Sequence, residues 1–188
     1  MTAETRANYS FKKKRGFISS MVFWHEIDQA CIEVVPSGRD RTRFRYQGGP
    51  LRFQIPRGLS KWGVSAYKSI QVDMSNAAFM EWWKTLERFL CAQEPFKSNL
   101  VGSTLRLKVD DATYFFDENS KQTNPEIKEG LLRGHEMSVL VDIEATYFFN
   151  GTWGLICRAA QIRSWANDEP EATEQPSVLT PSVCAFLD

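Results

Sequence analysis

Residues 136–165 read EMSVLVDIEATYFFNGTWGLICRAAQIRSW and contain the strongest indication of the fold. Its two apolar-rich runs, 136–149 and 153–165, are typical of β-strands, and Asn150-Gly151 lies between them. An Asn-Gly pair between two such runs is a strong hairpin signal, because both residues tolerate the positive φ angles of a two-residue turn. The sequence therefore predicts a long β-hairpin in the second half of the chain.

Further strands are predicted by strict alternation of apolar and polar residues. Residues 51–55 read LRFQI and residues 105–109 read LRLKV. Side chains alternate between the two faces of a strand, so each run buries one face and exposes the other. A second apolar run, 113–116, follows at once, which predicts a bend or a hairpin near Asp110-Asp111.

One helix is predicted between these strands, at about 76–92. Large apolar residues recur there at spacings of three and four, the pattern of one helix face. They are Phe79, Trp82, Trp83, Leu86, Phe89 and Leu90. Ser75 or Asn76 is the expected N-cap. Aromatic residues at helical spacing usually form core, so the tryptophans are assigned to the core and not to base stacking. Several strands with one amphipathic helix midway predict a mainly β, OB-like Greek-key barrel.

Length and composition indicate one domain with two tails. The chain has 188 residues and is 43% hydrophobic, enough for a single core. We expect a mobile basic N-terminal arm at 1–15, an OB-like nucleic-acid-binding domain at 16–165 and an acidic flexible tail at 166–188. The sequence contains no apolar run long enough to predict a membrane span, and no secretory signal is evident. The four scattered cysteines form no CxxC pair, which favours reduced cysteines, no metal site and an intracellular protein.

Residues 39–45, RDRTRFR, place an arginine at every second position. On a strand Arg39, Arg41, Arg43 and Arg45 would share one face, with Phe44 on the other. Like charges repel, so folding alone gives little reason to align them. From 39 to 68 there are eight basic residues against one acid, a local net charge of +7. The alternative interpretation is a solvated edge strand whose charges prevent aggregation.

Cations with interleaved aromatic rings are the chemistry of a groove for single-stranded nucleic acid. The expected nucleic-acid-binding residues are Arg39, Arg41, Arg43, Arg45, Arg52, Arg57, Lys61, Lys68, Arg106 and Lys108, with Trp62 and Tyr67 as first stacking candidates and Phe44 and Trp153 as second. The predicted function is a sequence-tolerant single-stranded DNA-binding protein. The alternative is an RNA-binding or virion nucleocapsid or scaffold protein that uses the same residues.

The C-terminal segment has the opposite charge. Residues 166–188 contain five acids and no base, which leaves residues 1–165 with a net charge of +5. Phe186, Leu187 and Asp188 form an apolar tip on this acidic segment. We expect the tip either to recruit a replication protein or to be a frayed terminus. Association into a homo-oligomer is left open by the sequence.

No enzymatic activity and no cofactor are predicted. The sequence contains no phosphate-binding loop, no zinc-protease motif and no nucleophile elbow. Asp110-Asp111 is a carboxylate pair, but adjacent residues of a strand point apart and turns often carry such pairs.

A family resemblance supports the same interpretation. The segments 50–56 (PLRFQIP), 62–65 (WGVS), the Trp-rich helix, 105–109 and 154–162 (GLICRAAQI) follow one another in order. This order resembles a group of single-stranded-DNA-binding proteins of large eukaryotic DNA viruses. That group is distantly similar to phage replication proteins with an OB-fold core and an acidic C-terminal tail. The resemblance implies a role in viral DNA replication, recombination or repair, in the host nucleus or at a cytoplasmic replication site.

Overall fold

The computed structural model describes residues 22–38 and 41–166. They form two 3₁₀ helices, η1 (Trp24–Glu26) and η2 (Gln29–Cys31), and one α-helix, α1 (Ala77–Leu90). The strands of the first half are β1 (Ile32–Pro36), β2 (Thr42–Tyr46), β3 (Gly49–Gln54), β4 (Gly58–Ser60) and β5 (Ser69–Asp73). Those of the second half are β6 (Phe96–Lys97), β7 (Leu100–Val101), β8 (Thr104–Lys108), β9 (Tyr114–Phe116), β10 (Gln122–Thr123), β11 (His135–Phe149) and β12 (Thr152–Trp165).

Five strands close into a barrel. β11 pairs with β4 and with β12, β4 pairs with β5, β5 pairs with β8, and β8 returns to β12. The β8–β12 pairing is parallel and the other four are antiparallel. Closure pairs each of these strands on both sides, which leaves the barrel without an open edge. The predicted OB-like barrel with one helix is confirmed.

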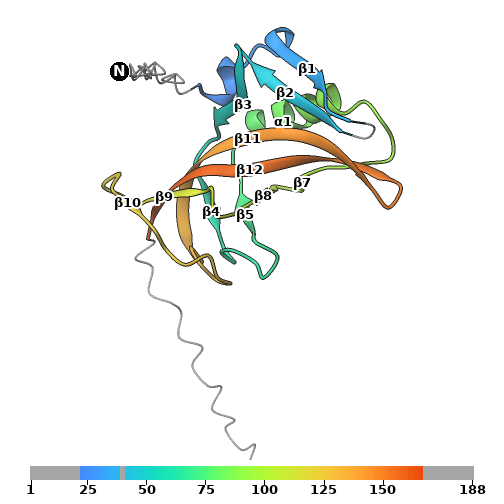
Figure 1. The fold of residues 1–188 in the computed structure, drawn as a ribbon. Helices are drawn as coiled ribbons and strands as arrows, with labels where there is room; N and C mark the ends of the chain where they lie inside the picture. The colour runs from blue at the N-terminus through green and yellow to red at the C-terminus, as the bar shows by residue number, and fades with distance from the viewer. Residues whose placement is uncertain (1–21, 39–40, 167–188) are drawn as a thin grey trace, which may run out of the picture.

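The long hairpin dominates the fold, and β11 and β12 curve together across the molecule (Figure 1). Asn150 and Gly151 have φ angles of 49° and 74°, as the Asn-Gly signal predicted. Near Asp110-Asp111 the chain bends but makes no hairpin, because β8 and β9 both run parallel to β12 and do not pair with each other. The amide of Thr113 donates to the carbonyl of Asp110 at 2.8 Å and closes this bend.

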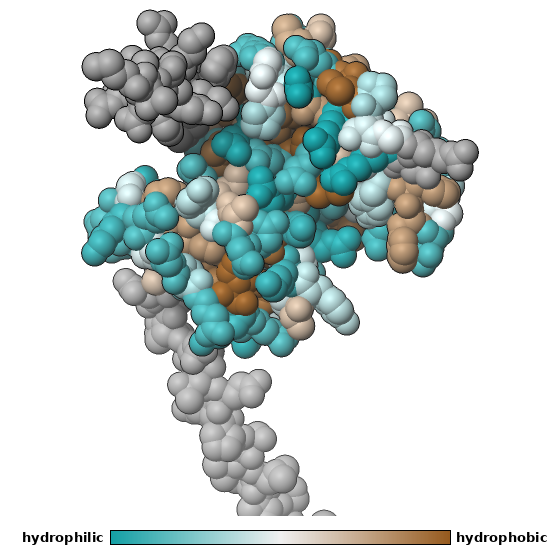
Figure 2. Space-filling model, viewed as in Figure 1, coloured by the Kyte–Doolittle hydropathy of each residue, from teal (hydrophilic) through white to brown (hydrophobic). Residues whose placement is uncertain are grey.

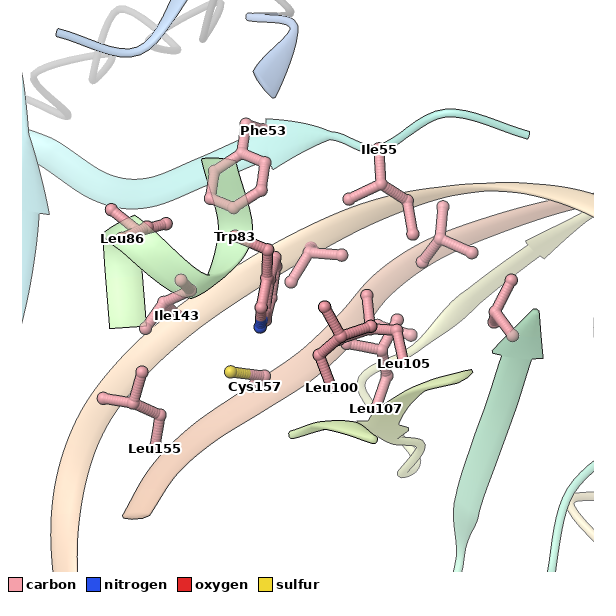
Figure 3. Packing of buried hydrophobic residues seen from close by; sticks show 14 of the residues in the cluster. Phe53, Ile55, Trp83, Leu86, Leu100, Leu105, Leu107, Ile143, Leu155 and Cys157 are labelled. Atoms are coloured by element: carbon pink, nitrogen blue, oxygen red, sulfur yellow. The ribbon is translucent and has the colours of Figure 1, made fainter. Parts of the chain in front are cut away.

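Helix α1 packs against the core as expected. Asn76 is its N-cap, because its side chain accepts a hydrogen bond from the amide of Phe79 at 2.9 Å. Trp83 and Leu86 point into the cluster that contains Phe53 of β3 and Ile143 of β11 (Figure 3). Burying an apolar side chain of this size contributes about 1.5–3 kcal/mol.

The helix prediction was wrong at one position. Phe89 is 46% exposed, although the spacing assigned it to the buried face. The apolar stripe of the sequence is therefore wider than the face that packs on the barrel.

A small antiparallel layer, β1-β2-β3, lies beside the barrel. β3 continues the barrel sheet through four register pairs with β11, and β2 touches β11 at the pair Ala145–Arg43. This pairing places the arginine strand beside β11 in the same sheet. None of the helices in the described part of the chain is long and apolar enough to cross a bilayer.

Several predictions fall on residues that the structure does not describe. They are the basic arm at 1–15, Arg39, the acidic tail from 167 onward and its tip Phe186, Leu187 and Asp188. These predictions, and the domain boundaries that depend on them, stay predictions.

Candidate nucleic-acid interface

Strand β2 presents arginines on one face and core residues on the other. Arg43 and Arg45 are exposed, whereas Phe44 and Tyr46 are buried. Arg41 is also exposed and directly precedes the strand. The predicted alternation is therefore present over 41–46. Phe44 was wrong as a stacking candidate, because it is only 3% exposed and packs in the core under β2.

The arginines of β2 face a hollow of about 380 Å³. We call it the arginine hollow. Arg41, Arg43, Arg45 and Arg158 line it, together with the carboxylates of Asp142 and Glu144. Four cations against two carboxylates leave a net charge of +2. Sequence reasoning missed Arg158; the available signal was a base inside the apolar-rich run 153–165.

A row of charged residues crosses the barrel perpendicular to its strands. Neighbours in the register are Lys108 and Arg158, then Arg158 and Asp142, then Asp142 and Arg52. Asp142 accepts two hydrogen bonds from Arg52 at 2.5 and 2.7 Å and one from Arg158 at 3.1 Å. The Asp142 side chain is 5% exposed, so this carboxylate needs its cationic partners to offset desolvation. The hydrogen bond to Asp142 raises the pKa of the Arg52 guanidinium. We call these four residues the charged row.

Other predicted cations also have acidic partners. Their N–O distances are 3.4 Å for Arg57–Glu136, 2.7 Å for Lys61–Asp73, 3.9 Å for Lys68–Asp111 and 3.5 Å for Lys108–Asp110. Hydrogen bonds from Lys61 and Thr104 lower the pKa of the Asp73 carboxyl. The local net of +7 over 39–68 therefore overstates the positive charge of the folded surface, because four of its eight bases have acidic partners: Arg52, Arg57, Lys61 and Lys68.

The four basic members of those pairs remain more than half exposed. Exposed ion pairs contribute only about 0–1 kcal/mol, so a phosphate can replace the carboxylate at small cost. Arg41, Arg43 and Arg45 differ from them, because none makes an ion pair with another described residue.

The first aromatic candidates lie on the loop between β4 and β5. Trp62 is 66% exposed and Tyr67 is 93% exposed. Trp62 lines a hollow with Gln71 and with Arg133, a cation that the sequence did not single out. At Gly63 an added Cβ would lie 2.5 Å from the carbonyl oxygen of Leu131, so only glycine fits this loop.

The remaining candidates lie on other parts of the barrel. Arg106 is exposed on β8 and lines a further hollow with Gln71 and Lys97. Trp153 is half-buried at the end of the long hairpin, where its ring centroid lies 5.0 Å from that of Phe148. Part of the Trp153 ring therefore packs against Phe148 and is not accessible to a base.

Two groups of candidates result. One surrounds the arginine hollow and the charged row, and the other surrounds the Trp62 loop. Figure 2 shows hydrophilic residues over much of the face on which β11 and β12 cross the molecule. Among the described residues, no three His, Cys, Asp or Glu side chains are close enough to hold a metal ion.

No protein-family model matches the sequence, and a search of curated proteins gives no significant match. Among solved structures, the single-stranded DNA-binding protein from bacteriophage Enc34 is similar, with 11% identity and a TM-score of 0.47 over 76% of this chain and 95% of that chain. The same phage protein in complex with single-stranded DNA has 11% identity and a TM-score of 0.45, over 74% and 98% of the two chains. Both are phage structures, so the resemblance to proteins of large eukaryotic DNA viruses stays a prediction.

Proposed function

We propose that this chain binds single-stranded DNA with little sequence preference, as a binding protein and not as an enzyme. The observation that carries the proposal is the convergence of Arg41, Arg43 and Arg45 with Arg158 on one hollow. The first three come from β2 and its approach, and the fourth comes from β12, more than a hundred residues later. Arg158 is balanced by ion pairs with Asp110, Asp142 and Glu144, whereas the other three arginines make no ion pair with a described residue. Bringing these three like charges together costs free energy, which a polyanion in the hollow would offset.

The charged row extends this surface across the barrel. Lys108 and Arg52 lie at its two ends, and their strands flank the hairpin that carries Arg158 and Asp142. A nucleic-acid backbone following the row would meet cations from three elements. Contacts of this kind recognise phosphates and carry no sequence information.

Exposed rings favour a single strand over a duplex. Trp62 and Tyr67 present faces that only unpaired bases can stack on, and stacking accepts every base. The process we propose is viral DNA replication, recombination or repair in an infected cell. RNA binding or nucleocapsid packaging is the alternative, because arginines at phosphates do not distinguish ribose from deoxyribose.

Fluorescence titration with oligo-dT at several salt concentrations tests the proposal. About four phosphate contacts in the arginine hollow predict that log K falls by about 2.8 for each tenfold rise in salt. A flat salt response, or equal affinity for a duplex of the same sequence, would contradict it. Tighter binding of a matched RNA oligonucleotide would favour the alternative, and magnesium-dependent cleavage of the oligonucleotide would show an enzyme.

We further propose that the acidic tail competes with DNA and recruits a replication protein through Phe186, Leu187 and Asp188. Five acids without a base favour cationic surface over phosphate. Deleting residues 167–188 should raise affinity for single-stranded DNA, most clearly at low salt, where screening is weak. A tail with its acids changed to amides is the matched control, and it should behave like the deletion.

A further inference from the structure

A second hollow, of about 550 Å³, lies on the outer face of the long hairpin. We call it the aromatic hollow. The guanidinium carbon of Arg57 lies 3.9 Å from the ring centroid of Trp165, and that of Arg163 lies 4.9 Å from it. Arg57, Arg163 and Trp165 all line the hollow, and none of its described lining residues is acidic. Glu136 pairs with Arg57 at 3.4 Å but does not line this hollow, whereas two carboxylates belong to the lining of the arginine hollow.

The rest of the lining combines flat apolar surface with amide groups. Phe23 is partly exposed, and its ring stacks on His25 with centroids 5.8 Å apart and planes 13° apart. The Gln54 amide donates to the Ser138 hydroxyl at 2.9 Å, which leaves its carbonyl oxygen available to accept. Gln161 adds a second amide. A ligand that fits is flat, has hydrogen-bonding edges and carries negative charge.

The two hollows adjoin along the same strands. On β3, Gln54 lines the aromatic hollow, and Arg52, two residues earlier, belongs to the charged row. On β11 their register partners are Leu140 and Asp142, which line the aromatic and the arginine hollow respectively. Residues two apart on a strand share a face and lie about 7 Å from each other. A bound strand that leaves the arginine hollow along this face therefore enters the aromatic hollow.

We propose that the aromatic hollow binds one nucleotide unit of the bound strand. Its base stacks on the Arg57–Trp165 pair, because a guanidinium that lies on an aromatic ring can accept a base on its other face. Arg163 binds the phosphate of this unit. The volume lies within the roughly 300–1,000 Å³ of sites that enclose small molecules. This inference rests on the proposed function, since it names where one base of the strand is held.

The test uses an oligo-dT strand that carries 2-aminopurine at one position, moved along the strand in a series. Because binding is sequence-tolerant, the strand occupies several registers, so we expect the wild type to quench the probe at several positions and Trp165→Ala to lose most of that quenching. The same variant should bind the strand about 5- to 140-fold more weakly, the range for losing one stacked base. Phe89→Ala is the matched control, because it removes a partly exposed ring on α1, and it should change neither readout.

Arg163→Gln tests the same hollow without removing a ring, for the case in which Trp165→Ala lowers the melting temperature. Arg163→Gln should reduce the salt dependence of log K by about 0.7 and weaken the quenching. Free thymidine monophosphate serves as a separate arm: it should not bind detectably at concentrations that saturate the strand, because only the tethered unit benefits from contacts in the arginine hollow. Tight binding of the free nucleotide would overturn the assignment to the strand.

Failure of this inference is distinguishable from failure of the proposed function. If the wild type does not bind oligo-dT, the proposed function is wrong. If the wild type binds and both variants match it in affinity and quenching, the aromatic hollow is not part of the path. That result would overturn the inference and leave the proposed function standing.

Discussion

The charged row predicts opposite effects of one substitution on stability and on DNA affinity. Asp142→Asn removes the carboxylate that accepts from Arg52 and Arg158, and it keeps the size of the side chain. Removing one partner of a buried ion pair costs about 3–5 kcal/mol, because the remaining charge is left in the protein. Here the arginine side chains are 29% and 19% exposed, so water can solvate part of their charge. We expect a loss of about 2–3 kcal/mol in the free energy of unfolding, about 4–12 °C in Tm.

The same substitution should strengthen DNA binding. It adds one net positive charge to the surface on which phosphates are expected. It also frees the Arg52 guanidinium, whereas Arg158 keeps its ion pairs with Asp110 and Glu144. One further phosphate contact steepens the salt dependence of log K by about 0.7, which amounts to about fivefold in affinity over a tenfold fall in salt. Thermal melting and oligo-dT titration on the same preparation measure both effects.

Glu81→Gln is the matched control for charge. It removes an equal negative charge from an exposed ion pair with Lys84 on α1, so stability and affinity should stay close to those of the wild type. If Asp142→Asn bound single-stranded DNA more weakly at a temperature where it is folded, the carboxylate would be part of the binding geometry. The electrostatic account of the charged row would then be wrong.

Three further predictions follow from the site and the core. Arg43→Ala combined with Arg45→Ala should weaken binding to all sequences alike and lower the salt slope by about 1.4, with little change in Tm; unfolding would show that these arginines stabilise the fold. Trp62→Ala should lose about 1–3 kcal/mol of single-strand affinity at unchanged Tm, because the ring is exposed, and a fall in Tm would instead indicate a packing role. Burial raises the pKa of Glu87 above its ordinary 4.5, so the folded state keeps this proton to higher pH than the unfolded state. The bound proton stabilises the fold below pH 4.5, and this stabilisation is lost as pH rises through the raised pKa. Glu87→Gln should flatten the dependence of unfolding free energy on pH just above 4.5, and an unchanged profile from urea titrations would contradict this assignment.

The barrel was predictable because its signals are local. The Asn-Gly turn, the alternation over 51–55 and 105–109 and the helical spacing after Asn76 each depend on residues a few positions apart. Hydrophobic burial then requires these elements to pack on one core. The exposure of Arg43 and Arg45 against buried Phe44 follows from the same two-residue period, so the face of the arginine strand was determined by the sequence alone.

The partners of the charges were decided only by the tertiary structure. Asp142 and Arg52 are 90 positions apart, and their contact depends on the register between β3 and β11, which no local pattern specifies. Contacts between other strands distant in sequence place Arg158 beside the arginines of β2 and Arg57 on the ring of Trp165. Charge counted along the chain therefore overestimated the cationic surface, because electrostatic energy depends on separation in space and not on position in sequence. Local sequence patterns predicted the principal strands and the outward face of β2, and the packing of those strands decided which outward charges remain available to a ligand.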